Sequence, residues 1–161
     1  MAAIELVNVS FAYPSDPSVR VIDSLSLSIA DGERHAILGA SGAGKTTLLN
    51  LLSGILQPTQ GRIYFDDVEV TELPGRARHL AQVFQFPVLY QSMTVGENLA
   101  FPLTTRGSNR RRADIDARVK AVADELNIEG ILNRPANGIS LFEKQLVAIG
   151  RALVRPDVSM V

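Results

Sequence analysis

The sequence contains no cysteine and no tryptophan, and only 6% of its 161 residues are aromatic. Without cysteine the chain can form neither a disulfide framework nor a thiolate metal site, which fits a reducing compartment. No apolar run is long enough to cross a bilayer, and the first residues lack the basic and apolar regions of a signal peptide. Neither sign of charge dominates: 16 Lys and Arg face 17 Asp and Glu, which argues against a nucleic-acid partner. The 46% hydrophobic content is typical of a folded domain.

One glycine-rich segment stands out in this composition. Residues 39–46 read Gly-Ala-Ser-Gly-Ala-Gly-Lys-Thr and fit the phosphate-binding pattern G-x-x-x-x-G-K-[ST]. An apolar run over 35–38 precedes the segment and is short enough for a buried strand, and apolar residues at helical spacing follow over 46–52. The alternative is a glycine-rich turn with an incidental lysine, but it leaves both flanks unexplained. The pattern and its flanks together predict nucleotide binding.

The residue types in this segment suit a triphosphate with its magnesium ion. Gly42 and Gly44 carry no Cβ, so the backbone can bend there and approach the phosphates closely. Successive N–H groups and the start of the following helix then form an anion site. Lys45 supplies a charge to the terminal phosphates, and Thr46 supplies a hydroxyl to Mg²⁺. The predicted nucleotide contacts are Gly39, Ser41, Gly42, Ala43, Gly44, Lys45, Thr46 and Thr47.

The first half of the chain predicts an antiparallel layer that leads into a parallel core. Alternating apolar and polar residues over 4–11 indicate a half-buried strand, and residues 21–29 read as its returning partner. The helix after the phosphate loop should end near Gly54. A hairpin follows over 62–70, and a second short apolar run covers 80–84.

Helical patterns dominate from Phe86 onwards. Capping-box spacing at Thr94 and Ser140, each with a glutamate three residues later, predicts two helix starts, the second helix running through Val154. Between them, a polar basic linker over 106–112 precedes a helix with one apolar face, and 158–161 begins another strand. We therefore expect three parts: a β layer with a nucleotide-binding core (1–85), a helical subdomain (86–154) and the start of a further strand (155–161). The apolar face consists of Ile115, Val119, Val122 and Leu126.

Five segments in order resemble the ATP-binding subunits of ABC transporters, and the resemblance covers the whole chain. Tyr13 after the first strand resembles the aromatic A-loop residue of that family, and 39–47 resembles its Walker A segment. Val83-Phe84-Gln85 is similar to the Q-loop. Residues 89–99 resemble the segment after that loop in carbohydrate and polyol importers, and 145–153 resembles the helix after the signature motif.

The resemblance implies a fold and two further site residues. The fold would be α/β, a P-loop NTPase of ABC type with an antiparallel β layer, an incomplete parallel sheet core and an inserted helical subdomain. Tyr13 would stack on the adenine; alternatively it is a strand-end tyrosine that covers the core. Gln85 would reach Mg²⁺ and the attacking water and would share the catalytic role with Lys45; alternatively it is a solvated strand-end residue.

The chain departs from the family at the signature motif. Leu-Ser-Gly-Gly-Gln is the family's sequence, and here the matching positions are Ile139-Ser140-Leu141-Phe142-Glu143. Leu141 and Phe142 put bulk where two glycines normally let the backbone approach a phosphate held by the opposite subunit. Ser140 matches the family serine, but a helix cap explains it equally well, and both readings stay open.

The family's Walker B aspartate and glutamate have no counterpart within the 161 residues. We therefore expect the chain as given to bind nucleotide poorly and to hydrolyse almost none, because phosphoryl transfer depends on positioning and charge neutralisation. The resemblance implies an ATPase in the intact protein. It would drive solute import from the cytoplasmic face of the cell membrane, with permease subunits, a second ATP-binding subunit and, indirectly, a solute-binding protein.

Three other functions compete with this one. An altered signature fits the weakly hydrolytic half of an asymmetric heterodimer. A soluble ABC ATPase of DNA repair or translation would not need the importer-like segment after Gln85, and near-neutral charge argues against it. A small-molecule kinase with a phosphate loop would leave Gln85 and 145–153 unexplained.

Overall fold

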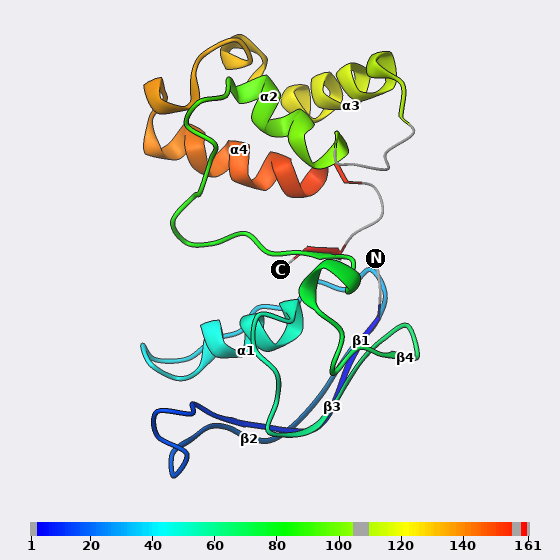
Figure 1. Ribbon diagram of the computed structural model, residues 1–161, viewed down its shortest axis with the longest axis vertical. Helices are drawn as coiled ribbons and strands as arrows, with labels where there is room; N and C mark the ends of the chain where they lie inside the picture. The colour runs from blue at the N-terminus through cyan, green and yellow to red at the C-terminus, as the bar shows by residue number, and fades with distance from the viewer. Residues whose placement is uncertain (1–2, 105–109, 156–158, 161) are drawn as a thin grey trace. The chain divides into compact units, whose positions relative to one another are not determined.

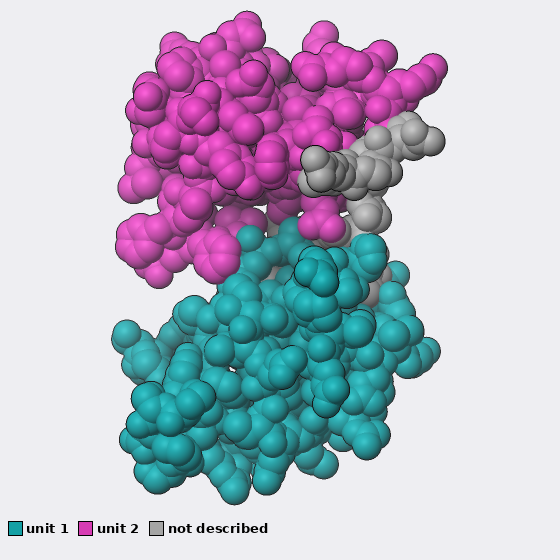
Figure 2. Space-filling model, in the orientation of Figure 1, with its two compact units in different colours: residues 1–82, 157–159, 161 teal, residues 83–156, 160 magenta. Residues whose placement is uncertain are grey.

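The computed structural model describes residues 3–104, 110–155 and 159–160 (Figure 1). The chain forms two compact units, which Figure 2 shows in different colours. The first unit consists mainly of residues 1–82 and the second mainly of residues 83–156. Each unit has its own hydrophobic core.

The first unit is built on an antiparallel sheet with the strand order β2-β1-β3-β4 (Figure 1). The alternating pattern and the hairpin correctly predicted these strands, and Asp66 with Asp67, both at positive φ, form the hairpin turn. Buried residues of the sheet pack with buried leucines of the helix α1 in one core. The elements are β1 (Ile4–Ala12), β2 (Arg20–Ile29), β3 (Gln60–Phe65), β4 (Val68–Glu69) and α1 (Lys45–Ser53).

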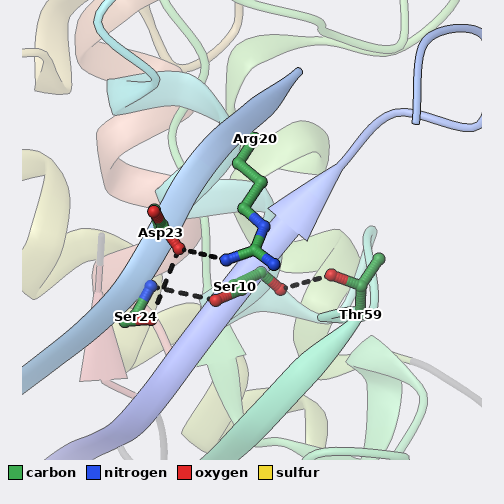
Figure 3. A network of polar contacts seen from close by, with 5 residues as sticks. All are labelled: Ser10, Arg20, Asp23, Ser24 and Thr59. Carbon is green, nitrogen blue, oxygen red and sulfur yellow. Dashed lines mark hydrogen bonds and ion pairs between the residues drawn. The ribbon is translucent and has the colours of Figure 1, made fainter. Parts of the chain in front are cut away.

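A buried serine ties three segments of this unit together (Figure 3). Ser10 in β1 is 2% exposed, and its hydroxyl oxygen accepts a 2.9 Å hydrogen bond from the Ser24 amide in β2. Its carbonyl accepts from the Thr59 hydroxyl at 2.9 Å, just before β3. Ser24 has a φ of 47°, and the pairing of β1 with β2 shifts register nearby, so these bonds satisfy polar groups that a regular ladder would pair.

The end of α1 is fixed by a buried arginine. Arg78 is 3% exposed and donates to the carbonyls of Leu51 at 2.7 Å and Leu52 at 3.2 Å, in the last turn of the helix. The last carbonyls of a helix lack the usual bond from the residue four positions on, so the guanidinium caps this end, together with the Gly54 amide, which donates to the Leu51 carbonyl at 3.3 Å. Burial lowers the pKa of Arg78 from its ordinary value. The helix ends at Gly54, which has a φ of 74°, and this confirms the predicted end.

The strand expected over 35–38 is not formed. Residues 31–40 are all exposed, and the side chain of Leu38 is 91% exposed. A buried strand needs neighbours for its backbone groups and covering for both faces, and in the described part of the chain no strand pairs with this segment. The second apolar run forms only the short strand β5 (Leu80–Ala81), which pairs with β6 (Ser159–Met160).

The second unit is helical and packs around a single apolar core. Both predicted capping boxes are formed, at Thr94 and at Ser140. The predicted apolar face is confirmed, with Ile115, Val119 and Val122 buried and Leu126 partly buried. Within the basic linker, residues 106–109 lie outside the described residues. The helices are α2 (Val95–Ala100), α3 (Arg112–Glu125) and α4 (Leu141–Leu153), with short 3-10 turns at Phe101–Leu103, Glu129–Ile131 and Ala136–Gly138.

None of the helices in the described ranges is long and apolar enough to span a bilayer.

Candidate nucleotide-binding site

The phosphate loop enters α1 through a glycine that no other residue could replace without strain. Gly44 has a φ of 86° and a ψ of 6°, the left-handed region, and it is the residue before the helix. A Cβ at this position would lie 3.1 Å from the Val21 carbonyl oxygen and 3.1 Å from Cδ1 of Ile22. Gly42 has a φ of 82°, so two glycines of the loop lie in the left-handed region. The sequence pattern thus reports a real backbone requirement.

The loop is largely exposed up to the start of α1. Residues 39–43 are exposed, and Thr46 in the first turn of α1 is exposed as well. The amide of Leu48 donates to the Gly44 carbonyl at 2.9 Å, which is the first bond of the helix. The N–H groups before it have no acceptor within the helix, and no acidic side chain stands in the first turn. This end of α1 therefore suits an anion.

The ammonium group of Lys45 lies over the same loop. Its Nζ donates to the carbonyl oxygens of Gly39 at 2.8 Å and of Ala40 at 2.7 Å. Both acceptors are neutral, and an anionic phosphate oxygen would make a stronger bond with the same group because donor and acceptor would then both be charged. The structure therefore places the Lys45 ammonium group against the backbone at the start of the loop, and the nucleotide contacts of residues 39–47 stay a prediction.

Tyr13 is held beside the first turn of α1. Its phenol oxygen lies 3.0 Å from the hydroxyl oxygen of Thr47, a residue that is itself 5% exposed. The ring meets the Phe11 ring edge to face, with centroids 4.9 Å apart. Tyr13 remains 38% exposed, so part of its ring is open to solvent. Both proposed roles, covering the core and stacking on a base, are compatible with this position.

Gln85 belongs to the second unit, where its side chain is exposed. Helix α4 contacts the backbone on either side of it, through Gln145 to the Phe84 carbonyl and through Arg151 to the Val88 carbonyl. The contact of Gln85 with metal and water stays a prediction.

Ser140 caps α4. Its hydroxyl oxygen accepts from the Glu143 amide at 3.2 Å, and its own amide donates to the Glu143 carboxylate at 2.7 Å. The Ser140 hydroxyl and amide together lower the pKa of the Glu143 carboxyl below its ordinary value, with Arg134 adding a smaller effect. Leu141 and Phe142 follow the cap with exposed fractions of 68% and 73%. The cap that the spacing predicted is thus formed, and a phosphate contact of Ser140 stays a prediction.

The residues fit a magnesium ion that arrives with its nucleotide. Among the residues that the structure describes, no three His, Asp or Glu side chains gather as a metal-binding group. The exposed Thr46 hydroxyl at the helix start can supply one oxygen ligand. Mg²⁺ in such sites is bound by one or two protein groups, substrate phosphates and water, which agrees with this sparse set.

Sequence comparisons identify relatives along almost the whole chain. The profile of the ABC transporter family matches residues 22–159. The trehalose/maltose import ATP-binding protein MalK of Thermococcus litoralis is 40% identical over 161 residues, and the sn-glycerol-3-phosphate import ATP-binding protein UgpC of Escherichia coli is 40% identical over 155. Each match covers 96% of this chain and 42% of the relative. The chain thus spans less than half the length of these proteins.

Solved structures agree with this family. The protein cbiO1 of Clostridium perfringens, described as part of the ABC transporter complex cbiONQ, superposes with a TM-score of 0.82 at 28% identity, over 94% of this chain and 61% of that one. The ATP-binding cassette MJ0796, a dimer with bound ADP and Pi, gives a TM-score of 0.82 at 29% identity, over 94% and 69%. These likenesses confirm the predicted fold class. The chain belongs to the ABC transporter family and has the α/β nucleotide-binding fold of its ATP-binding subunits.

Proposed function

We propose that the chain binds MgATP through the loop at 39–46, and that the subunit couples ATP binding and hydrolysis to the import of a carbohydrate or polyol solute. The observation that carries this proposal is the left-handed Gly44 followed by Lys45, whose ammonium group contacts the Gly39 and Ala40 carbonyls of an exposed loop at a helix start. The two relatives named above are import ATP-binding proteins, one for trehalose and maltose and one for sn-glycerol 3-phosphate.

Each predicted residue has a distinct task in this proposal. The loop amides and Lys45 bind the terminal phosphates, and Thr46 gives its hydroxyl to Mg²⁺, which neutralises phosphate charge. Tyr13 offers the open part of its ring to the adenine, and such stacking contributes about 1–3 kcal/mol with nucleic-acid bases. Gln85 orients the attacking water and contacts the metal. Ser140 is the one signature residue left for a phosphate of the opposite subunit.

The proposed partners follow from the work such a subunit must do. Two ATP-binding subunits, identical or different, close around ATP, and their closure switches the permease subunits between inward-facing and outward-facing states. Closure is favoured because ATP contacts both ATP-binding subunits only in the closed state. A solute-binding protein takes part indirectly, and we place the subunit at the cytoplasmic face of the membrane through the permease. The dimer of MJ0796 and the multi-subunit complex of cbiO1 support such an arrangement.

The test uses the complete subunit with its permease in proteoliposomes. We expect ATP-dependent uptake of a sugar or polyol, and we expect Lys45→Ala to abolish both uptake and ATP hydrolysis. Lys120→Ala removes an exposed lysine on α3 and is the matched control. Uptake that persists in Lys45→Ala, or a subunit that co-purifies with nucleic acid rather than with a membrane protein, would contradict the proposal.

A second candidate is the weakly hydrolytic half of an asymmetric heterodimer. Leu141 and Phe142, both largely exposed, occupy the positions of the two signature glycines. Their side chains keep the backbone away from a phosphate that glycines would contact, so one of the two ATP sites would hydrolyse slowly. A complex with two different ATP-binding subunits and one active site per pair would favour this candidate.

A further inference from the structure

The loop at 84–90, which contains Gln85, is held by the helices of its own unit at three backbone positions. The Gln145 side chain donates to the Phe84 carbonyl at 3.4 Å. Arg151 donates to the Val88 carbonyl at 2.7 Å. Asn98, which is fully buried, accepts from the Tyr90 amide at 2.9 Å and donates to its carbonyl at 3.0 Å. Two of the three anchors come from α4, the helix that the signature segment opens.

Two apolar side chains on the outer part of the loop are largely exposed to solvent. Phe86 is 74% exposed and Val88 is 72% exposed. Leu89, near the end of the loop, is 6% exposed and packs in the core of the second unit. Apolar side chains that stay in water do not hold a segment in place, so over 84–88, where Gln85 lies, the bonds to the Phe84 and Val88 carbonyls position the backbone. Among these bonds, the one from Arg151 is the shortest and is charge-assisted, which makes it the strongest.

Arg151 makes a second contact with the same loop. Its guanidinium carbon lies 5.0 Å from the centre of the Tyr90 ring, within the range of a cation–π contact. The Tyr90 ring in turn packs at a tilt of 49° against the Phe101 ring, with 4.4 Å between centroids. The Nε of Arg151 is buried and has no acceptor among the described residues. Burying that donor is unfavourable by itself, and the two loop contacts offset it.

We propose that Arg151 is a positioning residue for Gln85. Arg151 lies in α4, and its contacts tie the backbone of the 84–90 loop, which contains Gln85, to that helix. The proposal rests on the role assigned above to Gln85. Any displacement of α4, whose first residues form the altered signature, then moves the Gln85 loop with it. A change at the signature end of α4 is thereby passed to the residue that orients the attacking water.

The direct test measures backbone hydrogen exchange in the complete subunit. In Arg151→Met the loop loses both the bond to Val88 and the contact with Tyr90, and we expect exchange over 84–92 to rise about tenfold, which is the effect of one charge-assisted hydrogen bond. Exchange over 45–53 in α1 and over 112–125 in α3 should not change. An equal rise across the whole second unit would mean that Arg151 only stabilises the fold, and unchanged exchange over 84–92 would also overturn the proposal.

Variants of the ring provide a second route that leaves Arg151 in place. Tyr90→Phe keeps the aromatic face and should exchange like the wild type, whereas Tyr90→Leu should raise exchange over 84–92. The Tyr90→Leu effect should be smaller when Arg151→Met is already present, since both remove the same contact. If the effects of Tyr90→Leu and Arg151→Met on exchange were additive, the shared contact between the two side chains would be contradicted.

A kinetic readout links the anchor to Gln85. In the transporter complex, Arg151→Met should lower kcat for ATP about tenfold while KM for MgATP stays within about twofold, because the phosphate loop is untouched. Arg151→Lys should restore part of kcat. A raised KM with normal kcat would overturn the proposal. If the wild-type complex neither binds nor hydrolyses ATP, the proposed function fails, while the exchange experiment still decides whether Arg151 holds the loop.

Discussion

The phenol oxygen of Tyr13 lies 3.0 Å from the hydroxyl oxygen of Thr47, and this contact joins the residue after β1 to the first turn of α1. Tyr13 is therefore placed by the phosphate-binding helix as well as by the Phe11 ring. A side chain that is already fixed loses less conformational entropy when a ligand stacks on it. The contact thus couples the predicted adenine platform to the phosphate loop.

Two substitutions at Tyr13 separate the ring from its hydroxyl. Tyr13→Phe keeps the ring but loses the bond to Thr47, so the ring must be ordered when the base stacks, and we expect the Kd for MgATP to rise by at most about tenfold, the upper limit set by one neutral hydrogen bond. Tyr13→Ala also removes the ring and should weaken binding further. Calorimetry of the complete subunit measures both. Tripolyphosphate has no base, so its affinity should be the same in all three proteins; a weakened affinity for tripolyphosphate would show that Tyr13 serves the phosphate loop instead.

The signature positions offer a prediction about activity. Changing both Leu141→Gly and Phe142→Gly removes the exposed bulk at the start of α4, and we expect the ATPase rate of the assembled complex to rise. The reason is that a backbone without Cβ can approach a phosphate of the opposite subunit more closely. An unchanged rate would remove the main support for the asymmetric heterodimer.

Ser140→Ala serves as the control for that experiment. It should lower the stability of the second unit by about 1 kcal/mol, because it removes the helix cap. If Ser140 also contacts phosphate, the ATPase rate of the glycine-restored complex should fall as well. Thermal melting measures the loss of stability. The ATPase rate, measured at a temperature where the proteins with and without Ser140→Ala are both folded, then shows whether Ser140 also contacts phosphate.

Because of the two capping boxes, we expect the stability of the second unit to change with pH in the acid range. Hydrogen bonds from Thr94 lower the pKa of Glu97, and hydrogen bonds from Ser140 lower that of Glu143, each from an ordinary value of 4.5. A carboxylate with a depressed folded-state pKa stabilises the fold fully above its unfolded pKa, and the contribution is lost as pH falls through the folded value. Stability of the second unit should therefore decline below pH 4.5.

Glutamine variants test this pH dependence. Glu97→Gln and Glu143→Gln keep an acceptor for the cap but cannot titrate, so urea midpoints should vary less with pH below 4.5 than in the wild type. Glu129→Gln, at a glutamate for which the structure gives no cap, is the matched control. Identical pH profiles for all four proteins would contradict the assignment.

Local signals in the sequence predicted much of the structure. The caps at Thr94 and Ser140 and the end of α1 at Gly54 depend on residues within four positions, and all three are formed. The residues of the phosphate loop are likewise contiguous, so their pattern could be recognised directly. The prediction of a strand over 35–38 was wrong because a buried strand needs neighbouring strands to pair with, and the apolar residues of the segment do not specify them.

Contacts between distant residues could not be predicted in this way. Thr47 lies 34 positions from Tyr13, and Arg151 lies 63 positions from Val88. Nothing in either neighbourhood indicates the partner, and the buried Arg78 gave no signal either. These contacts position Tyr13 and the end of α1 in the first unit and the Gln85 loop in the second, and each forms only when its own unit folds.

The affinity of the complete subunit for MgATP, measured with and without Lys45, tests the central claim most directly. Lys45 places its ammonium group 2.8 Å from the Gly39 carbonyl and 2.7 Å from that of Ala40, over the predicted phosphate position. Losing one charge-assisted bond of about 1.5–3 kcal/mol should raise the Kd of Lys45→Ala about 10- to 100-fold, with Lys120→Ala unchanged. Equal Kd values for Lys45→Ala and the wild type would contradict the account.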